Sequence, residues 1–94
     1  MKQELILVYI CDDVKSTYSK HLVLATTSAR KAVNYIKERI RAGEFMYCPV
    51  GSANWTTSQQ VKELEKDRKE LGLRNVVGSL VYAWVQFVED GVPI

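Results

Sequence analysis

Apolar residues fall into compact runs separated by polar segments, and each run predicts one element. Residues 3–11 (QELILVYIC) are rich in β-branched and aromatic side chains and end at Asp12-Asp13, which predicts a strand buried on both faces. A second run extends from His21 to Thr26 after a short polar connection with turn-forming residues. Two apolar runs joined in this way favour an antiparallel hairpin.

Helical spacing begins after the Thr26-Thr27-Ser28 cluster, whose hydroxyls can cap a helix. The apolar positions that recur at this spacing are Ala29, Ala32, Val33, Ile36 and Ile40, and the pattern stops at Ala42-Gly43. The opposite face carries a basic stripe, which we expect to face solvent: Arg30, Asn34, Lys37 and Arg41.

A second helix is predicted from Thr56-Thr57 to Leu71, where Gly72 ends it. Its apolar stripe is narrow (Val61, Leu64 and Leu71), and Glu65 and Lys69 form a favourable i,i+4 pair. Between the two helices, Phe45 to Cys48 is at most a short edge strand because Pro49 follows it. Gly51 to Asn54 is predicted to be a loop.

The last segment, Leu73 to Glu89, fits both periodicities, because Val77, Val81, Trp84 and Val88 also have helical spacing. Its β-branched and aromatic residues favour a strand, which Asp90-Gly91 would end. The predicted fold is therefore a single α+β domain over residues 1–94. It has two helices and a mainly antiparallel sheet of three to four strands, in the order β-β-α-(β)-α-β.

Composition adds few constraints on function. The chain has 94 residues, of which 47% are apolar and 26% are charged, as in an ordinary globular domain. Its net charge of +2 gives no overall field that would mark a nucleic-acid or membrane binder. The apolar runs Leu5–Cys11 and Leu80–Val85 are too short for a signal peptide or a membrane span.

Two separated cysteines, Cys11 and Cys48, favour reduced thiols and hence a cytoplasmic protein. Cys11 ends the first strand and His21 begins the second, so some registers would bring them together near Asp12 or Asp13. That arrangement would imitate a Cys-His-Asp site, although a free cysteine more often packs as a small apolar group. A thiol-dependent enzyme is therefore the third hypothesis for function.

Cofactor and metal sites are not predicted. One histidine and two separated cysteines fall short of the ligands that structural zinc needs, and Asp12-Asp13 lacks the spacing of a calcium loop. The Gly51–Asn54 loop lacks the lysine of a P-loop, so we interpret it as a plain loop.

One face of the sheet is expected to lack cover, because three apolar strands meet only one strongly amphipathic helix. The uncovered face would bind a second copy of the chain or another protein. The alternative is that the second helix and the loop around Trp55 close over this face.

The candidate partner-binding residues fall into two groups. The basic stripe (Arg30, Lys37 and Arg41, with Lys31 and Arg39 at its margins) could bind nucleic-acid phosphates or an acidic protein surface, or could simply be solvated. The aromatic group consists of Trp55, Tyr82 and Trp84. Trp55 is either an exposed anchor or packs beside Val61, and Tyr82 and Trp84 would lie on one face of the last strand.

The layout of two strands, a hydroxyl-capped helix (LILVYICDD, then HLVLATTSARKAVNYIKERI), a charged helix and a closing strand resembles a known group. It is similar to small uncharacterised proteins carried by phages and mobile elements of Gram-positive bacteria. The resemblance implies a modulator of host machinery, such as an inhibitor of a defence system, and carries no catalytic residue. The leading hypothesis is thus a non-catalytic protein-binding module, and a nucleic-acid binder is the alternative.

Overall fold

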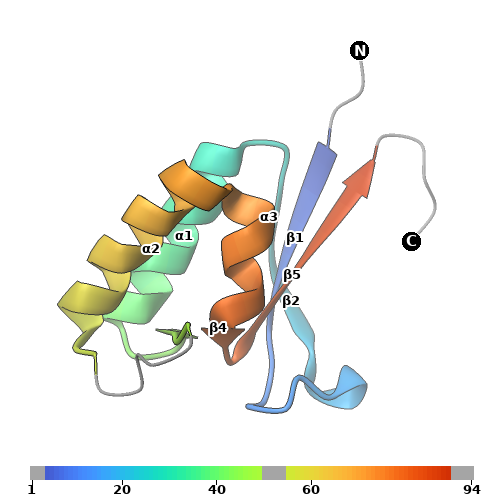
Figure 1. The fold of residues 1–94 in the computed structure, drawn as a ribbon. Helices are drawn as coiled ribbons and strands as arrows, with labels where there is room; N and C mark the ends of the chain where they lie inside the picture. The colour runs from blue at the N-terminus through green and yellow to red at the C-terminus, as the bar shows by residue number, and fades with distance from the viewer. Residues whose placement is uncertain (1–3, 50–54, 90–94) are drawn as a thin grey trace.

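The computed structural model describes residues 4–49 and 55–89 (Figure 1). One antiparallel sheet has the order β2-β1-β5, built from β1 (Glu4–Ile10), β2 (His21–Thr26) and β5 (Ala83–Glu89). A separate two-stranded sheet pairs β3 (Met46–Tyr47) with β4 (Leu80–Val81). The helices are α1 (Ala29–Arg41), α2 (Thr57–Leu71) and α3 (Leu73–Val76), with short 3-10 turns at Thr17–Ser19 and Val77–Ser79. The predicted α+β class is confirmed.

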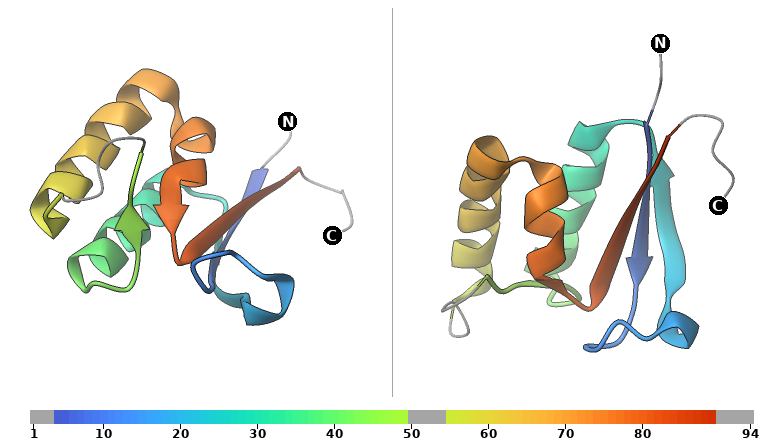
Figure 2. Two further views of the ribbon diagram at one scale, coloured as in Figure 1. Left: turned by 60° about the horizontal axis from the view of Figure 1, so that its bottom comes forward. Right: turned by 45° about the vertical axis from the view of Figure 1, so that its right-hand side comes forward.

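The elements form layers on one side of the sheet. Figures 1 and 2 show all three helices on the same side of β1, β2 and β5, with α1 and α3 next to the strands and α2 outermost. Consistent with this, α1 contacts β1 and β2, whereas α2 packs on α1, α3 and β3. None of the described helices has the length and apolar character needed to cross a bilayer.

Local capping signals set the bounds of both long helices. The Ser28 side chain accepts a hydrogen bond from the Lys31 backbone N–H and so caps α1. Thr56 and Gln59 form a reciprocal capping box at the start of α2. Gly72 follows α2 with a φ of 89°, a backbone conformation that glycine adopts without strain. Both predicted helices therefore begin and end where the sequence places them.

The core lies between the sheet and the helices. Ile6 and Val8 of β1 face it, together with Ala32 and Ile36 of α1. Its other buried members are Ile40, Phe45, Tyr47, Leu64, Val76, Val77, Leu80 and Ala83. Trp55 and Val61 pack against this cluster, so the core-packing interpretation of Trp55 is the correct one.

The opposite face of the sheet carries no described helix, and we call it the helix-free face. Strand alternation and the two pairing registers assign its members: Leu5, Leu7, Tyr9, Leu22, Ala25, Trp84, Gln86 and Val88. All described helices lie on one side of the sheet, as expected (Figure 2, right). The other face is nevertheless only partly open, because Leu7 (4% exposed) and Val88 (8% exposed) are buried on it, whereas Leu22 and Trp84 are exposed. The alternative, in which α2 and Trp55 close over the second face, is wrong because both lie on the core side.

The last segment is a strand, as predicted, but two details differ there and one differs in α2. Leu73–Ser79 forms α3 and a 3-10 turn instead of extended chain. Tyr82 separates β4 from β5 with a φ of 68°, so it does not share the strand alternation that places Trp84. Leu71 is 57% exposed and does not join the apolar stripe of α2. The predicted loop Gly51–Asn54 and the strand end at Asp90-Gly91 lie outside the described residues.

A buried amide ties β3 to the start of α2. Gln60 is 5% exposed, and its Oε1 accepts a hydrogen bond of 2.9 Å from the Tyr47 backbone N–H. Its Nε2 donates to the Trp55 carbonyl at 3.1 Å. The Tyr47 hydroxyl donates to Asp67 at 2.6 Å, and burial, followed by that bond, raises the pKa of Tyr47. These bonds fix α2 against β3, because a buried donor without an acceptor is costly.

Gln60→Met is expected to lower the free energy of unfolding by about 1–3 kcal/mol, since it leaves the buried Tyr47 N–H without its acceptor. Denaturant unfolding followed by circular dichroism measures this change. Lys66→Met, on an exposed position of the same helix, is the matched control and should change stability by no more than about 0.5 kcal/mol. Equal losses in both variants would contradict a specific role for the amide.

Candidate functional site

A row of three large side chains crosses the helix-free face. Tyr9 in the central strand pairs with Leu22 on one side and with Trp84 on the other, so all three point the same way. Leu22 is 53% exposed and Trp84 is 37% exposed. The register shifts between Val8 and Tyr9, and the extra residue opposite, Val23, is 38% exposed. This end of the face presents apolar surface to solvent.

The helix-free face holds no charged side chain among its eight defined residues. The Lys20 ammonium, at the start of β2, lies 3.2 Å from the centroid of the Trp84 ring. A cation over an indole is an attractive arrangement, and here it occupies one face of the Trp84 ring. The Tyr9 hydroxyl donates to Gln86 Oε1 at 3.4 Å, which links two of the polar side chains on the face.

Exposed apolar side chains concentrate at the same end of the sheet. Of the seven large hydrophobic residues exposed in the described chain, six lie in the β1–β2 connection, in β2 or at the start of β5: Val14, Tyr18, Leu22, Val23, Tyr82 and Trp84. Leu71, at the end of α2, is the seventh. A cluster of this kind is typical of an interaction surface, whereas single exposed apolar residues are ordinary.

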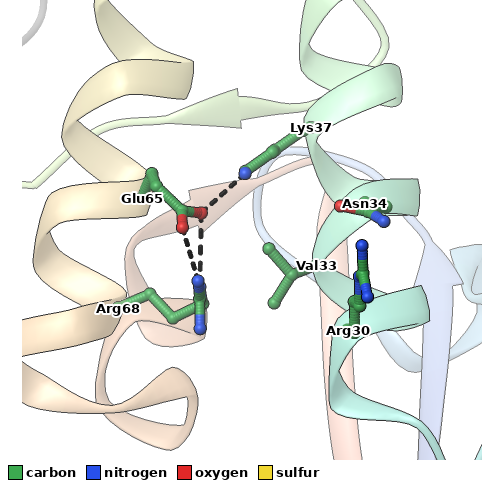
Figure 3. A pocket seen from close by; sticks show the side chains of 6 residues that line it. All are labelled: Arg30, Val33, Asn34, Lys37, Glu65 and Arg68. Atoms are coloured by element: carbon green, nitrogen blue, oxygen red, sulfur yellow. Dashed lines mark hydrogen bonds and ion pairs between the residues drawn. The ribbon is translucent and has the colours of Figure 1, made fainter.

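A second candidate site is a hollow of about 410 Å³ between α1 and α2 (Figure 3). Its lining residues are Arg30, Val33, Asn34 and Lys37 from α1, with Glu65 and Arg68 from α2. Figure 3 shows Val33 between the two helices and the charged side chains around it. Three cations and one carboxylate leave this hollow with an excess of two positive charges.

Glu65 links the two helices across this hollow. Lys37 Nζ lies 2.6 Å from Glu65 Oε2, and Arg68 donates to the same carboxylate at 2.5 and 3.3 Å. These hydrogen bonds, from Arg68 first and Lys37 second, lower the pKa of Glu65 to about 2. Lys69, the predicted i,i+4 partner, is farther away at 3.8 Å.

The basic stripe of α1 is divided between two environments. Arg30 and Lys37 line the hollow and face α2, which corrects the expectation that this side of α1 faces only solvent. Arg41 instead pairs with Glu38 at 2.6 Å, and Arg39 pairs with Glu44 at 2.7 Å. The stripe is therefore not a continuous row of unpaired cations.

Sequence reasoning missed the partners that complete both sites. Glu65 and Arg68 have i,i+3 spacing, which predicts their local pair, but no sequence signal indicates that Lys37 joins them. The sequence places Tyr9 and Leu22 in strands but does not indicate which face of the sheet they occupy. Once the hairpin register is known, alternation places them beside Trp84.

The residues of the supposed thiol site do not come together as a catalytic group. His21 pairs opposite Ile10 and is exposed, whereas Cys11 is 8% exposed and its backbone N–H donates to the Tyr82 carbonyl. Asp12 accepts hydrogen bonds from Ser16. Burial is the main cause that raises the pKa of the Cys11 thiol, which opposes formation of the reactive thiolate. Residues 4–49 and 55–89 also contain no group of three potential metal ligands.

Glu65→Gln is expected to lower the free energy of unfolding by about 1 kcal/mol near neutral pH, because it removes a charged link between α1 and α2. The folded-state pKa is depressed from 4.5 to about 2, so the contribution is complete above 4.5 and is lost as pH falls toward 2. Denaturant unfolding over this pH range tests it. Glu70→Gln is the control, and a wild-type advantage that persists at the lowest pH would contradict the cause.

Cys11 is expected to react with iodoacetamide more slowly than Cys48 in the folded protein, because Cys11 is buried and has a raised pKa while Cys48 is half-buried. Mass spectrometry of the labelled peptides measures both rates in one sample. Both rates should converge in denaturant. Faster alkylation of native Cys11 would revive the thiol hypothesis.

Comparison with known proteins gives no match of any kind: no family model, no curated protein and no solved structure matches this chain. The function proposed next therefore rests on the geometry of the helix-free face.

Proposed function

We propose that this protein is a non-catalytic protein-binding module and that its partner at the helix-free face is a second copy of the same chain. The observation that carries the proposal is the row Leu22–Tyr9–Trp84 on a face without helical cover, in which Leu22 and Trp84 are exposed and Tyr9 between them is half-buried. Removing apolar surface of this kind from contact with water is favourable. A second apolar sheet face could provide that cover.

The absence of charge on the defined face supports a self-complementary contact. In a two-fold dimer, the same patch meets itself, so any fixed charge near the axis would meet a like charge. The eight defined residues carry none, although the Lys20 ammonium lies over the Trp84 ring, and the Tyr9 hydroxyl bonds to Gln86 within the same face. Two such faces can pack about 10 Å apart as the layers of a β-sandwich, provided that the Lys20 ammonium over the Trp84 ring keeps its contact with solvent.

The size of the face indicates a weak dimer. Two strands of seven residues and one of six give the whole sheet face a flat area of roughly 320 Å², of which the part around the buried Leu7 and Val88 is not exposed. Standard interfaces bury about 800 Å² on each partner, so the β1–β2 connection with Val14 and Tyr18 has to contribute. We expect a dissociation constant between about 10 μM and about 1 mM.

The alternative hypotheses have less support. Ion pairs occupy three of the five basic side chains of α1, which weakens a nucleic-acid interface along that helix. The buried Cys11 and exposed His21 weaken the thiol-enzyme hypothesis. The modulator role that the layout resemblance implies stays a prediction, and the surface offered to a host protein would be the same apolar face.

Sedimentation velocity from about 10 μM to about 1 mM tests the dimer. The wild-type protein should shift from monomer toward dimer across this range. Leu22→Lys should weaken association at least about tenfold, since it brings like charges together at the buried row. Leu22 is exposed, as is Leu71, the position of the control variant described next. Circular dichroism should therefore find both lysine variants folded.

Leu71→Lys is the matched control, because Leu71 is 57% exposed, close to the 53% of Leu22, but lies at the end of α2. It should associate like the wild type. A wild-type protein that is monomeric at the highest concentration overturns the second-copy proposal. Equal weakening by both lysine variants would also overturn it, since the contact would not be specific to the helix-free face.

A further inference from the structure

The hollow between α1 and α2 is lined by cationic side chains whose N–H donors are not all hydrogen-bonded within the described part of the chain. We propose that it binds the phosphate group of a small molecule, held by Arg30, Lys37 and Arg68. This site is independent of the helix-free face, because all its lining residues come from the two helices on the core side of the sheet.

Several side-chain N–H groups at the hollow have no acceptor in the described part of the chain. Arg30 is exposed and has no ion-pair or hydrogen-bond partner in the described part of the chain. Asn34, one turn later, likewise keeps its side-chain amide unbonded within that part. Arg68 gives Glu65 only two of its N–H groups, and Lys37 gives it one. Each cation therefore retains donors for a further acceptor.

Glu65 acts here as a positioning residue. It holds Lys37 and Arg68, from opposite walls, on one carboxylate, which fixes both side chains at the edge of the hollow (Figure 3). Lys37 is only 19% exposed and Arg68 is 32% exposed, so neither moves freely in solvent. Prearranged cations cost a ligand less ordering than free side chains would.

Charge and size together favour a phosphate monoester. The excess of two positive charges matches the charge of a phosphate monoester, which approaches −2 near neutral pH. Guanidinium groups also match phosphate geometry by donating two parallel hydrogen bonds. The volume of about 410 Å³ lies within the range of small-molecule sites and leaves room beyond the phosphate for an organic group.

Titration of the isotope-labelled protein with inorganic phosphate, followed by NMR at constant ionic strength, tests the site. Saturable shifts should concentrate on the amides of Arg30, Asn34 and Lys37 and on the Arg68 side chain, with a dissociation constant of about 1 mM or tighter. Phenyl phosphate, titrated in the same way, separates the two sources of the group. Tighter binding than inorganic phosphate indicates an organic ester, and equal binding indicates free phosphate.

Arg30→Gln should weaken phosphate binding at least about tenfold, because it removes the cation that has no partner among residues 4–49 and 55–89. Lys31→Gln is the matched control: it removes the same charge from the neighbouring exposed position, outside the hollow, and should change affinity less than about twofold. Equal weakening in both variants, equal binding of acetate, or shifts that do not saturate would overturn the proposal. The spectra themselves report whether each variant is folded.

Discussion

The packing of α1 against one face of the three-stranded sheet is the constraint on which the rest of the structure depends. Ile6 and Val8 face Ala32 and Ile36, and this contact is the centre of the core. Only Thr27 and Ser28 separate β2 from α1, so the helix returns directly onto the sheet. Strand side chains alternate between the two faces of a sheet. β1 therefore places Ile6 and Val8 in the core and Leu7 and Tyr9 on the opposite face. An apolar second face is therefore a consequence of how β1 is built.

α2 and α3 lie on the same side of the sheet as α1. α3 lies next to the strands, and α2 forms the outer layer. α2 packs on α1, α3 and β3, and its contact with α1 is partly apolar and partly ionic. Where the contact is ionic, Glu65 draws Lys37 and Arg68 together and a hollow stays open above Val33. The charged side chains stay partly exposed in this part of the helix interface, and full burial would carry a desolvation cost that can exceed the gain from their pairing. The cationic hollow and the apolar face thus arise from one arrangement, with the helices stacked on a single side.

The elements that sequence could predict are those with local signals. The hydroxyl of Ser28, the Thr56–Gln59 capping box and the glycine after Leu71 define both long helices within the chain itself. The run His21–Thr26 matches β2 for the same reason. α3 has four residues, too few to establish a helical period. The positive φ of Tyr82 also has no local signal, because an aromatic residue rarely adopts it.

The candidate sites were predicted less completely than the fold, because they depend on contacts between distant elements. The lack of cover on one sheet face follows from counting apolar strands against amphipathic helices. The row Leu22–Tyr9–Trp84 additionally needs the hairpin register, and the bulge at Val23 cannot be found from composition. The pairing of Lys37 with Glu65 needs the angle at which α1 and α2 meet. The packing of Trp55 beside Val61 could be predicted because the two residues are close in sequence.

The central claim, that the helix-free face is covered by a second copy of the chain, is tested most directly by isotope-filtered NMR. Mixing carbon-labelled and unlabelled protein reports only contacts between the two copies. The account predicts intermolecular contacts from Tyr9, Leu22 and Trp84. Contacts from α1 or α2 alone, or none at concentrations where association is measured, would contradict it.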